Sequence, residues 1–141
     1  MKDDHRNHSF VTFEIMEKKI ITTSAAPSPI GPYSQAVQVG NILFVSGQIA
    51  INPSTGSIDA TDIIDETHQA MHNLKTILSE AQMDFHNVVK TTIFISDMSL
   101  FASVNEVYGK YFHGDFPARE TVAVKGLPKN ANVEISVIAA R

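Results

Sequence analysis

The alternation of hydrophobic and polar residues predicts several short strands and two amphipathic helices. Strand-like runs occupy residues 18–23, 36–39, 42–46, 88–95, 121–124 and 133–139. Gly40-Asn41 separates the second and third runs by two residues, which indicates a β-hairpin. In the run 88–95, one face is expected to carry Val89, Thr91, Ile93 and Ile95.

Two segments have helical periodicity. The first extends from residue 59 to residue 83, with Asp59, Thr61 or Asp62 placed to cap its start. Its inward stripe comprises Ile63, Thr67, Ala70, Leu74, Ile77, Leu78 and Ala81. The second is expected to follow Asp97 or Ser99 and to be broken at Phe116-Pro117. Its apolar stripe comprises Leu100, Phe101, Val104, Tyr108, Tyr111 and Phe112.

The order of these elements is strand, strand, strand, helix, strand, helix, strand, strand. Such an order favours an α+β fold in which both helices cover one face of a single sheet. The chain offers no third helix for the opposite sheet face. We therefore expect an oligomer that buries that face.

The first residues differ from the rest of the chain. Residues 1–15 are polar, and we interpret them as a flexible N-terminal arm attached to a folded domain of residues 16–141. Met16 stands just before the first strand and is a candidate alternative start. Farther on, residues 25–33 contain three prolines and end at Tyr33, which predicts a stiff loop able to hold a binding side chain.

Composition narrows the function classes. The net charge of −4 and the lack of a Lys/Arg-rich run argue against nucleic acid as a partner. The sequence has no cysteine, which excludes disulfides, thiolate nucleophiles and cysteine-ligated metals. No apolar stretch has the roughly 20 residues of a membrane helix, and the N-terminus lacks the apolar centre of a secretory signal. These features favour a cytoplasmic protein.

Familiar catalytic motifs are missing. His68 and His72 have a metal-ligand spacing, but Gln69 replaces the glutamate of a zincin motif, so a solvated polar face is favoured and no metal is expected. The sequence contains neither a Gly-x-Ser-x-Gly motif nor a Gly-rich phosphate loop.

Two charged residues remain as candidates for chemistry. Arg119 follows a proline bend and opens a strand, where its planar fork requires either an internal acid or an anionic ligand. Glu134 lies within a strand on the face opposite Val133, Ile135 and Val137. It is either a surface or interface acid, or a carboxylate whose raised pKa suits proton transfer near neutral pH.

Seven short motifs in order resemble the RidA/YjgF family across about residues 17–141. They are Ile30-Gly31-Pro32-Tyr33-Ser34-Gln35-Ala36, Ser46-Gly47-Gln48, Asn52-Pro53-x-Thr55-Gly56, Lys90-Thr91-Thr92-Ile93-Phe94, Phe101-Ala102-x-Val104-Asn105, Phe116-Pro117-Ala118-Arg119 and Val133-Glu134-Ile135. The resemblance implies a chorismate-mutase-like, six-stranded mixed sheet with two helices on one face. It also implies a barrel-like homotrimer with sites in the clefts between subunits.

The same resemblance implies an activity and its residues. Active members hydrolyse enamine/imine compounds such as 2-iminobutanoate and 2-iminopropanoate to 2-oxo acids and ammonia, without a metal or cofactor. By position, Arg119 would bind the substrate carboxylate and Glu134 would direct the water. The substrate would also contact Tyr33, Ser46, Gly47, Asn105 and Thr121. Thr121 stands where many members carry a cysteine.

Two other functions are compatible with such a fold. Endoribonuclease activity or translation inhibition is also attributed to the family, but this chain has no basic stripe or aromatic stacking run to support it. A non-catalytic trimer that binds small carboxylates, or acts as a chaperone, would keep Arg119 and lack turnover.

Overall fold

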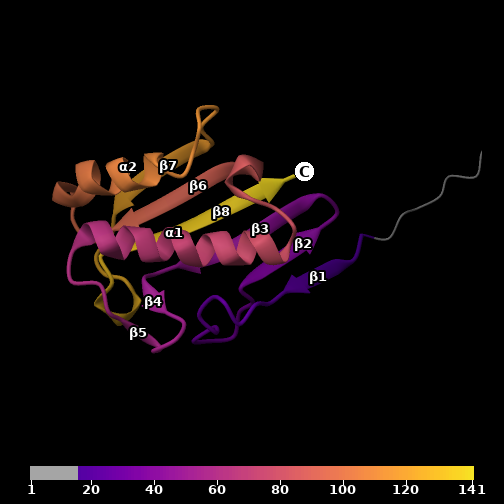
Figure 1. The fold of residues 1–141 in the computed structure, drawn as a ribbon, viewed down its shortest axis with the longest axis horizontal. Helices are drawn as coiled ribbons and strands as arrows, with labels where there is room; N and C mark the ends of the chain where they lie inside the picture. The colour runs from indigo at the N-terminus through magenta and orange to yellow at the C-terminus, as the bar shows by residue number, and fades with distance from the viewer. Residues whose placement is uncertain (1–15) are drawn as a thin grey trace, which may run out of the picture.

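A computed structural model describes residues 16–141, and the predictions made for residues 1–15 lie outside them. Its centre is a six-stranded sheet in the order β1-β2-β3-β8-β6-β7 (Figure 1). These strands are β1 (Lys18–Ile21), β2 (Ala36–Val39), β3 (Ile42–Gln48), β6 (Val88–Ile95), β7 (Ala118–Ala123) and β8 (Val133–Ala140). All neighbouring pairs are antiparallel except β6–β7, which is parallel.

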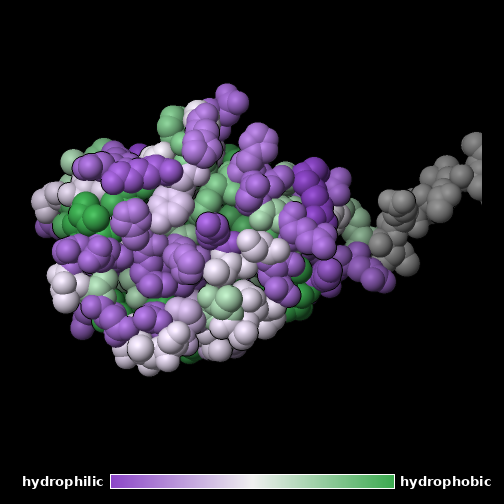
Figure 2. Space-filling view, in the orientation of Figure 1, coloured by the Kyte–Doolittle hydropathy of each residue, from purple (hydrophilic) through white to green (hydrophobic). Residues whose placement is uncertain are grey.

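Both helices lie against one face of this sheet, as predicted (Figure 1). Helix α1 (Ile63–Glu80) crosses the middle strands, and α2 (Phe101–Gly109) lies beside β6 and β7. The side chain of Asp62 accepts a hydrogen bond from the Asp65 backbone N–H at 2.8 Å, so Asp62 is the N-cap of α1. Hydrophilic side chains predominate on the outer surface over α1, as an amphipathic helix requires (Figure 2).

The core fills the space between the helices and the sheet. The inward residues Val133, Ile135 and Val137 of β8 pack there, as their alternation predicts. Helix α1 also buries two polar residues outside its predicted stripe, Glu66 and Asn73. Both are hydrogen-bonded, which is the condition for burying such groups.

The opposite face of the sheet is open. It presents Ile20, Phe44 and Val122, which are 47%, 47% and 43% exposed, and it also carries Ile138 of β8. Apolar side chains on several strands of one face form the kind of surface that soluble proteins cover with a partner.

One face assignment was wrong. Val89 is 50% exposed and Val88 is buried in its place, because the β6–β8 register shifts between Val88 and Lys90. The bulge inserts one residue, so the simple alternation holds only from Thr91 onward.

Several predicted boundaries also differ. A two-stranded hairpin of β4 (Ile51–Asn52) and β5 (Ser57–Ile58) flanks the predicted turn and was missed. Helix α2 ends at Gly109, before Phe116-Pro117, and Asp97 caps a separate 3₁₀ turn, Met98–Leu100. Further 3₁₀ turns occupy Phe85–Asn87 and Pro128–Asn130.

The interpretation of a solvated face at His68 and His72 holds for His72, which is exposed, but not for His68, which is partly buried. Its Nδ1 lies 2.7 Å from the Tyr111 hydroxyl, and the two rings pack at 5.7 Å between centroids. Within residues 16–141, no group of three His, Asp or Glu side chains is arranged to hold a metal. Neither of the helices described is long and apolar enough to cross a membrane.

Candidate active site

The Pro-rich loop is anchored at its base by one buried amide. Gln35 accepts a hydrogen bond from Thr23 N at 2.7 Å and donates to the carbonyls of Thr23 and Pro27 at 3.0 and 2.9 Å. At the loop's end, Tyr33 N donates to Gly31 O at 2.9 Å, and the Tyr33 hydroxyl accepts from Ile30 N at 3.1 Å. The Tyr33 ring is therefore held in place although half of it is exposed.

Ser46 and Gly47 form a bulge in β3. Val45 pairs with Val137 and Gln48 pairs with Ile135, so β3 has one residue more than β8 between these pairs. The Ser46 hydroxyl donates to Ser34 O at 2.6 Å. This hydrogen bond ties the bulge to the end of the Pro-rich loop, and it occupies the Ser46 hydroxyl proton.

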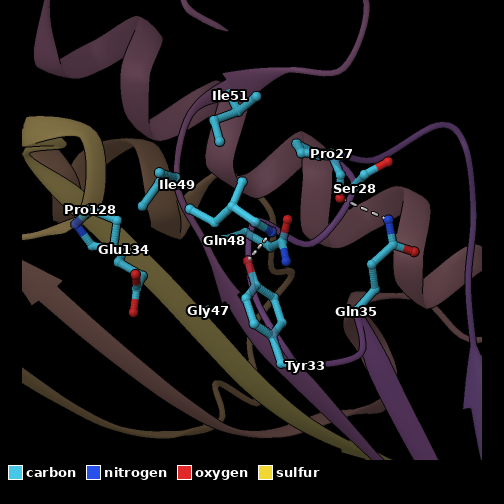
Figure 3. Close-up of a pocket in the computed structure, with 11 residues that line it drawn as sticks. Pro27, Ser28, Tyr33, Gln35, Gly47, Gln48, Ile49, Ile51, Pro128 and Glu134 are labelled. Carbon is cyan, nitrogen blue, oxygen red and sulfur yellow. Dashed lines mark hydrogen bonds between the residues drawn. The ribbon is translucent and has the colours of Figure 1, made fainter. Parts of the chain in front are cut away.

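Gly47 provides the space that Glu134 occupies. A Cβ atom on Gly47 would lie 2.5 Å from Glu134 Oε1 and 2.7 Å from its carboxyl carbon, far inside van der Waals contact. Figure 3 shows Tyr33 and Glu134 on either side of Gly47. Burial raises the pKa of the Glu134 carboxyl above its ordinary value.

Tyr33, Gly47 and Glu134 line a small pocket, here called the Glu134 pocket (Figure 3). Its volume is about 40 Å³, and its walls include Ile30, Ile49, Ile51 and Pro128. A raised pKa and apolar walls are the conditions under which a carboxylate exchanges protons near neutral pH.

Arg119 lies on β7, an edge strand of the sheet, against α2. Its guanidinium carbon is 5.0 Å from the ring centroid of Tyr108 and 5.9 Å from that of Phe101. Phe101, Asn105 and Tyr108 are four and three residues apart, so they share one face of α2. A second hollow of about 310 Å³, here called the Arg119 pocket, is lined by Asn105, Tyr108, Gly109, Phe116, Pro117 and Arg119.

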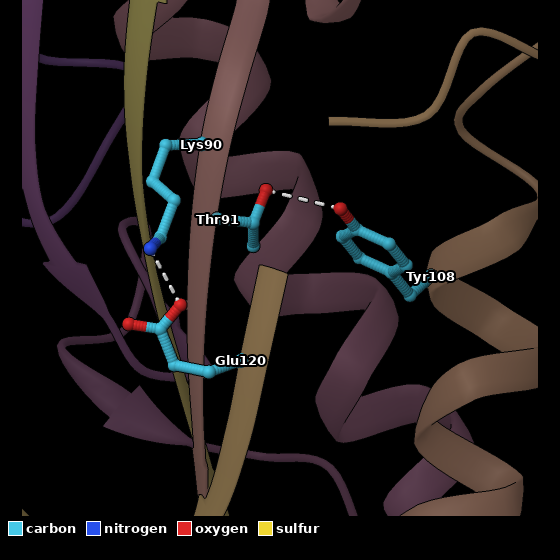
Figure 4. Close-up of polar contacts among 4 residues, drawn as sticks. All are labelled: Lys90, Thr91, Tyr108 and Glu120. Carbon is cyan, nitrogen blue, oxygen red and sulfur yellow. Dashed lines mark hydrogen bonds and ion pairs between the residues drawn. The ribbon is translucent and has the colours of Figure 1, made fainter. Parts of the chain in front are cut away.

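Arg119 has no internal acid as a partner among residues 16–141. The ion pair nearby joins Lys90 Nζ to Glu120 Oε2 at 2.7 Å, and it lies on the other side of the sheet (Figure 4). Stacking on aromatic rings engages the faces of a guanidinium and leaves its edge N–H groups available to a planar anion.

Arg119 and Glu134 lie on opposite faces of the sheet. Arg119 is in register with Thr91, whose side chain points into the helix-covered core, whereas Glu134 is paired with Phe94 and faces the open side. Strand β6 also separates β7 from β8. One chain therefore brings Tyr33, Ser46 and Gly47 to Glu134, and separately brings Asn105 to Arg119.

Thr121 follows Arg119 on the helix-covered side of β7, in register with Ile93. Its hydroxyl oxygen is buried and has no hydrogen-bond partner within the described part of the chain. Buried hydroxyls without partners are rare in folded proteins, so this atom is a candidate for an intermolecular contact.

Sequence reasoning assigned no functional role to Tyr108 or Thr91. It placed Tyr108 in the apolar stripe of the second helix and Thr91 on the same strand face as Ile93 and Ile95. The spacing of Phe101, Asn105 and Tyr108 was the available signal, because it aligns two aromatic rings with a polar candidate on one helical face.

Comparisons with known proteins agree with this architecture. The family model described as endoribonuclease L-PSP matches residues 23–141. A mouse protein named 2-iminobutanoate/2-iminopropanoate deaminase is 48% identical over 86% of this chain and 90% of its own length.

Solved structures are similarly close. The Rid family protein YyfA from Yersinia pestis superposes with a TM-score of 0.86 at 48% identity, covering 89% of this chain and all of that one. Escherichia coli TdcF with bound serine gives 0.84 at 42% identity, covering 87% and 98% of the two chains. Because the family model spans most of the described domain, the chain belongs to the endoribonuclease L-PSP family, the RidA/YjgF family that its motifs resemble.

Proposed function

We propose that this chain is a 2-iminobutanoate/2-iminopropanoate deaminase, which converts small 2-imino acids and water to 2-oxo acids and ammonia. The observation that carries the proposal is Arg119, whose guanidinium is stacked on Phe101 and Tyr108 without an internal acid. A guanidinium that contacts aromatic rings and has no internal acid can bind a planar carboxylate through two parallel hydrogen bonds. The activity named for the mouse relative has such a substrate.

The complete site requires two copies of the chain. A small imino acid cannot contact Arg119 and Glu134 of the same chain, because these residues lie on opposite faces of the sheet and on strands two spacings, or about 10 Å, apart. We propose a homotrimer in which Arg119 of one subunit and Glu134 of its neighbour face a shared cleft. The open apolar face around Phe44 supports this arrangement because it requires cover.

The reaction consumes one water, and in each of its two steps Glu134 carries one proton from oxygen to nitrogen. In the first step, the Glu134 carboxylate accepts a proton from water as the oxygen attacks the imine carbon, the C=N electron pair moves to nitrogen, and Glu134 gives that proton to the nitrogen. In the second step, the carbinolamine hydroxyl gives its proton to Glu134 as the carbonyl forms. Glu134 then protonates the nitrogen as the C–N bond breaks, which releases ammonia and restores the carboxylate. Such proton transfers contribute about 10²–10⁴-fold.

The remaining candidates would shape the cleft. Tyr33 would form a wall beside Glu134, and the Ser46–Gly47 bulge would lie along the substrate. Asn105 would support the carboxylate from the Arg119 pocket. The Thr121 hydroxyl would obtain its missing partner from the substrate or from the neighbouring subunit.

The proposal is tested by release of 2-oxo acid in an assay in which a dehydratase generates the imine. We expect Arg119→Ala to abolish the acceleration. Arg119→Lys should lose most of it, because an ammonium group cannot reproduce the bidentate fork. Lys125→Ala, which removes an exposed cation elsewhere, serves as the matched control. Unchanged product release by Arg119→Ala would overturn the proposal, and RNA cleavage that depends on Arg119 would replace it.

A further inference from the structure

The aromatic face on which Arg119 stacks is itself fixed by a buried hydrogen bond. The Tyr108 hydroxyl donates to Thr91 Oγ1 at 3.0 Å, joining α2 to β6 (Figure 4). Thr91 is fully buried and Tyr108 is 4% exposed. Burial raises the pKa of the Tyr108 hydroxyl, while the Thr91 hydrogen bond and the charge of Arg119 oppose that rise. The phenol therefore stays protonated at neutral pH and remains a donor.

The sheet register places the same threonine directly beside the arginine. Thr91 is opposite Arg119 in the parallel β6–β7 pair, and both side chains lie on the helix-covered side. A β-branched side chain has a restricted χ1 angle, so the Thr91 hydroxyl is a stiff acceptor. It fixes the Tyr108 ring at the position where the guanidinium lies 5.0 Å from the ring centroid.

This geometry affects ligand binding through entropy. A free arginine side chain must give up its rotamer freedom when it grips a carboxylate. The cation–π contacts of the guanidinium with the Tyr108 and Phe101 rings impose part of that order before the ligand arrives. A Tyr108 ring released from Thr91 would be less able to impose it.

We propose that Thr91, through Tyr108, is a positioning residue for the carboxylate-binding guanidinium of Arg119. The proposal rests on the proposed function only in assigning the carboxylate to Arg119. It predicts that Thr91 governs carboxylate affinity although its own side chain is buried away from any ligand.

Three variants of the full-length chain test it. Thr91→Val keeps the shape and removes the acceptor, Thr91→Ser keeps the acceptor, and Tyr108→Phe keeps the ring and removes the donor. Thr67→Val is the matched control, since Thr67 is equally buried and its hydroxyl bonds Ile63 O at 2.7 Å within α1. The measurements are the Kd of 2-oxobutanoate, and KM and kcat in the dehydratase-coupled assay.

We expect Thr91→Val and Tyr108→Phe each to raise Kd and KM about 5- to 30-fold with a smaller change in kcat. Thr91→Ser and Thr67→Val should stay near wild type. The double variant Thr91→Val/Tyr108→Phe should bind no more weakly than the weaker single variant, because both changes remove one hydrogen bond. Melting temperatures of all variants identify any that fail to fold.

Each contrary result has a definite meaning. Wild-type affinity in Thr91→Val, or an equal loss in Thr67→Val, overturns the proposal. Loss in Tyr108→Phe alone also overturns it, because the hydroxyl would then act on the ligand directly. If Arg119→Ala itself binds 2-oxobutanoate normally, the proposed function fails. If Arg119→Ala loses binding while Thr91→Val keeps it, only the positioning role fails.

Discussion

At the scale of single residues, Gly47 is constrained by the Glu134 side chain that lies against it. We expect Gly47→Ala to displace the Glu134 carboxylate, since its new Cβ would lie 2.5 Å from Oε1. Deaminase activity should fall at least tenfold, given the contribution of one positioned acid, with little change in the fold. The measurement is kcat/KM beside Gly126→Ala, whose Cβ would meet no atom within 4 Å. Equal activity in the two variants would refute the steric role.

The raised pKa of Glu134 predicts the pH dependence of the reaction. Burial disfavours the charged carboxylate, so its pKa lies above the ordinary value of 4.5. As a base, Glu134 must be ionised, so kcat/KM should decrease as the pH falls through this raised pKa. Glu134→Gln should be nearly inactive and should lack this acid limb. A limb that persists in Glu134→Gln would assign it to another group.

The raised pKa of Glu134, which suits catalysis near neutral pH, lowers the stability of the fold at that pH. A carboxyl whose folded-state pKa is raised costs stability as the pH rises from the unfolded pKa through the folded one. Glu134→Gln removes this cost, so we expect its melting temperature to exceed that of wild type at neutral pH and to approach it at acid pH. A gain of this kind would be an instance of the trade-off between stability and activity at a functional site.

At the scale of elements, the sequence was most informative where the period was regular. The α1 stripe and the alternation in β8 rest on repeated apolar positions, and the structure confirms both. The sequence was least informative at the two β-bulges, where β3 and β6 each contain one inserted residue. The bulge before Lys90 reversed the assignment of Val89, and the bulge at Gly47 hid its steric relation to Glu134. Such relations depend on register between distant strands, which no local pattern encodes.

Helix α1 carries a buried contact that anchors the strand of Glu134. Glu66 accepts hydrogen bonds from Asn132 N at 2.7 Å and Asn132 Nδ2 at 3.0 Å, just before β8 begins. Asn132 Oδ1 in turn accepts from the Ser96 hydroxyl at 2.9 Å. The start of β8 is therefore held by α1 and by the segment after β6.

Glu66→Ala is expected to destabilise the fold by about 2–4 kcal/mol, because it leaves two donors of Asn132 without their acceptor. Glu66→Gln keeps one acceptor oxygen and should cost less. Urea unfolding of both variants measures the difference, with Glu80→Ala at the exposed end of α1 as the control. Equal stability of Glu66→Ala and Glu80→Ala would show that this contact contributes little.

At the scale of the whole molecule, Arg119 and Glu134 lie on opposite faces of the sheet, and one of these faces is apolar and open. Both features have the same explanation if a second subunit covers the open face. In the mechanism we propose, catalysis by Arg119 and Glu134 would require a neighbour, and the face that carries Phe44, Ile138 and Glu134 is the one that this neighbour would cover. Burying this face and completing the site are then the same event. A charged substitution such as Phe44→Lys should reduce both oligomer mass and activity.

Subunit mixing distinguishes a shared site from a site within one chain. Arg119→Ala and Glu134→Gln are each expected to be inactive alone. When the two variants are co-expressed in equal amounts and assemble at random, about one quarter of the clefts should combine an intact arginine with an intact glutamate. Activity should therefore recover to about a quarter of the wild-type value, whereas separately purified variants mixed without subunit exchange should stay inactive. If co-expression restores nothing while mixed oligomers are verified by mass, the arginine and the glutamate do not act in one intersubunit cleft. Arg119 and Glu134 would then belong to two separate sites, and the reaction at each would have to be assigned anew.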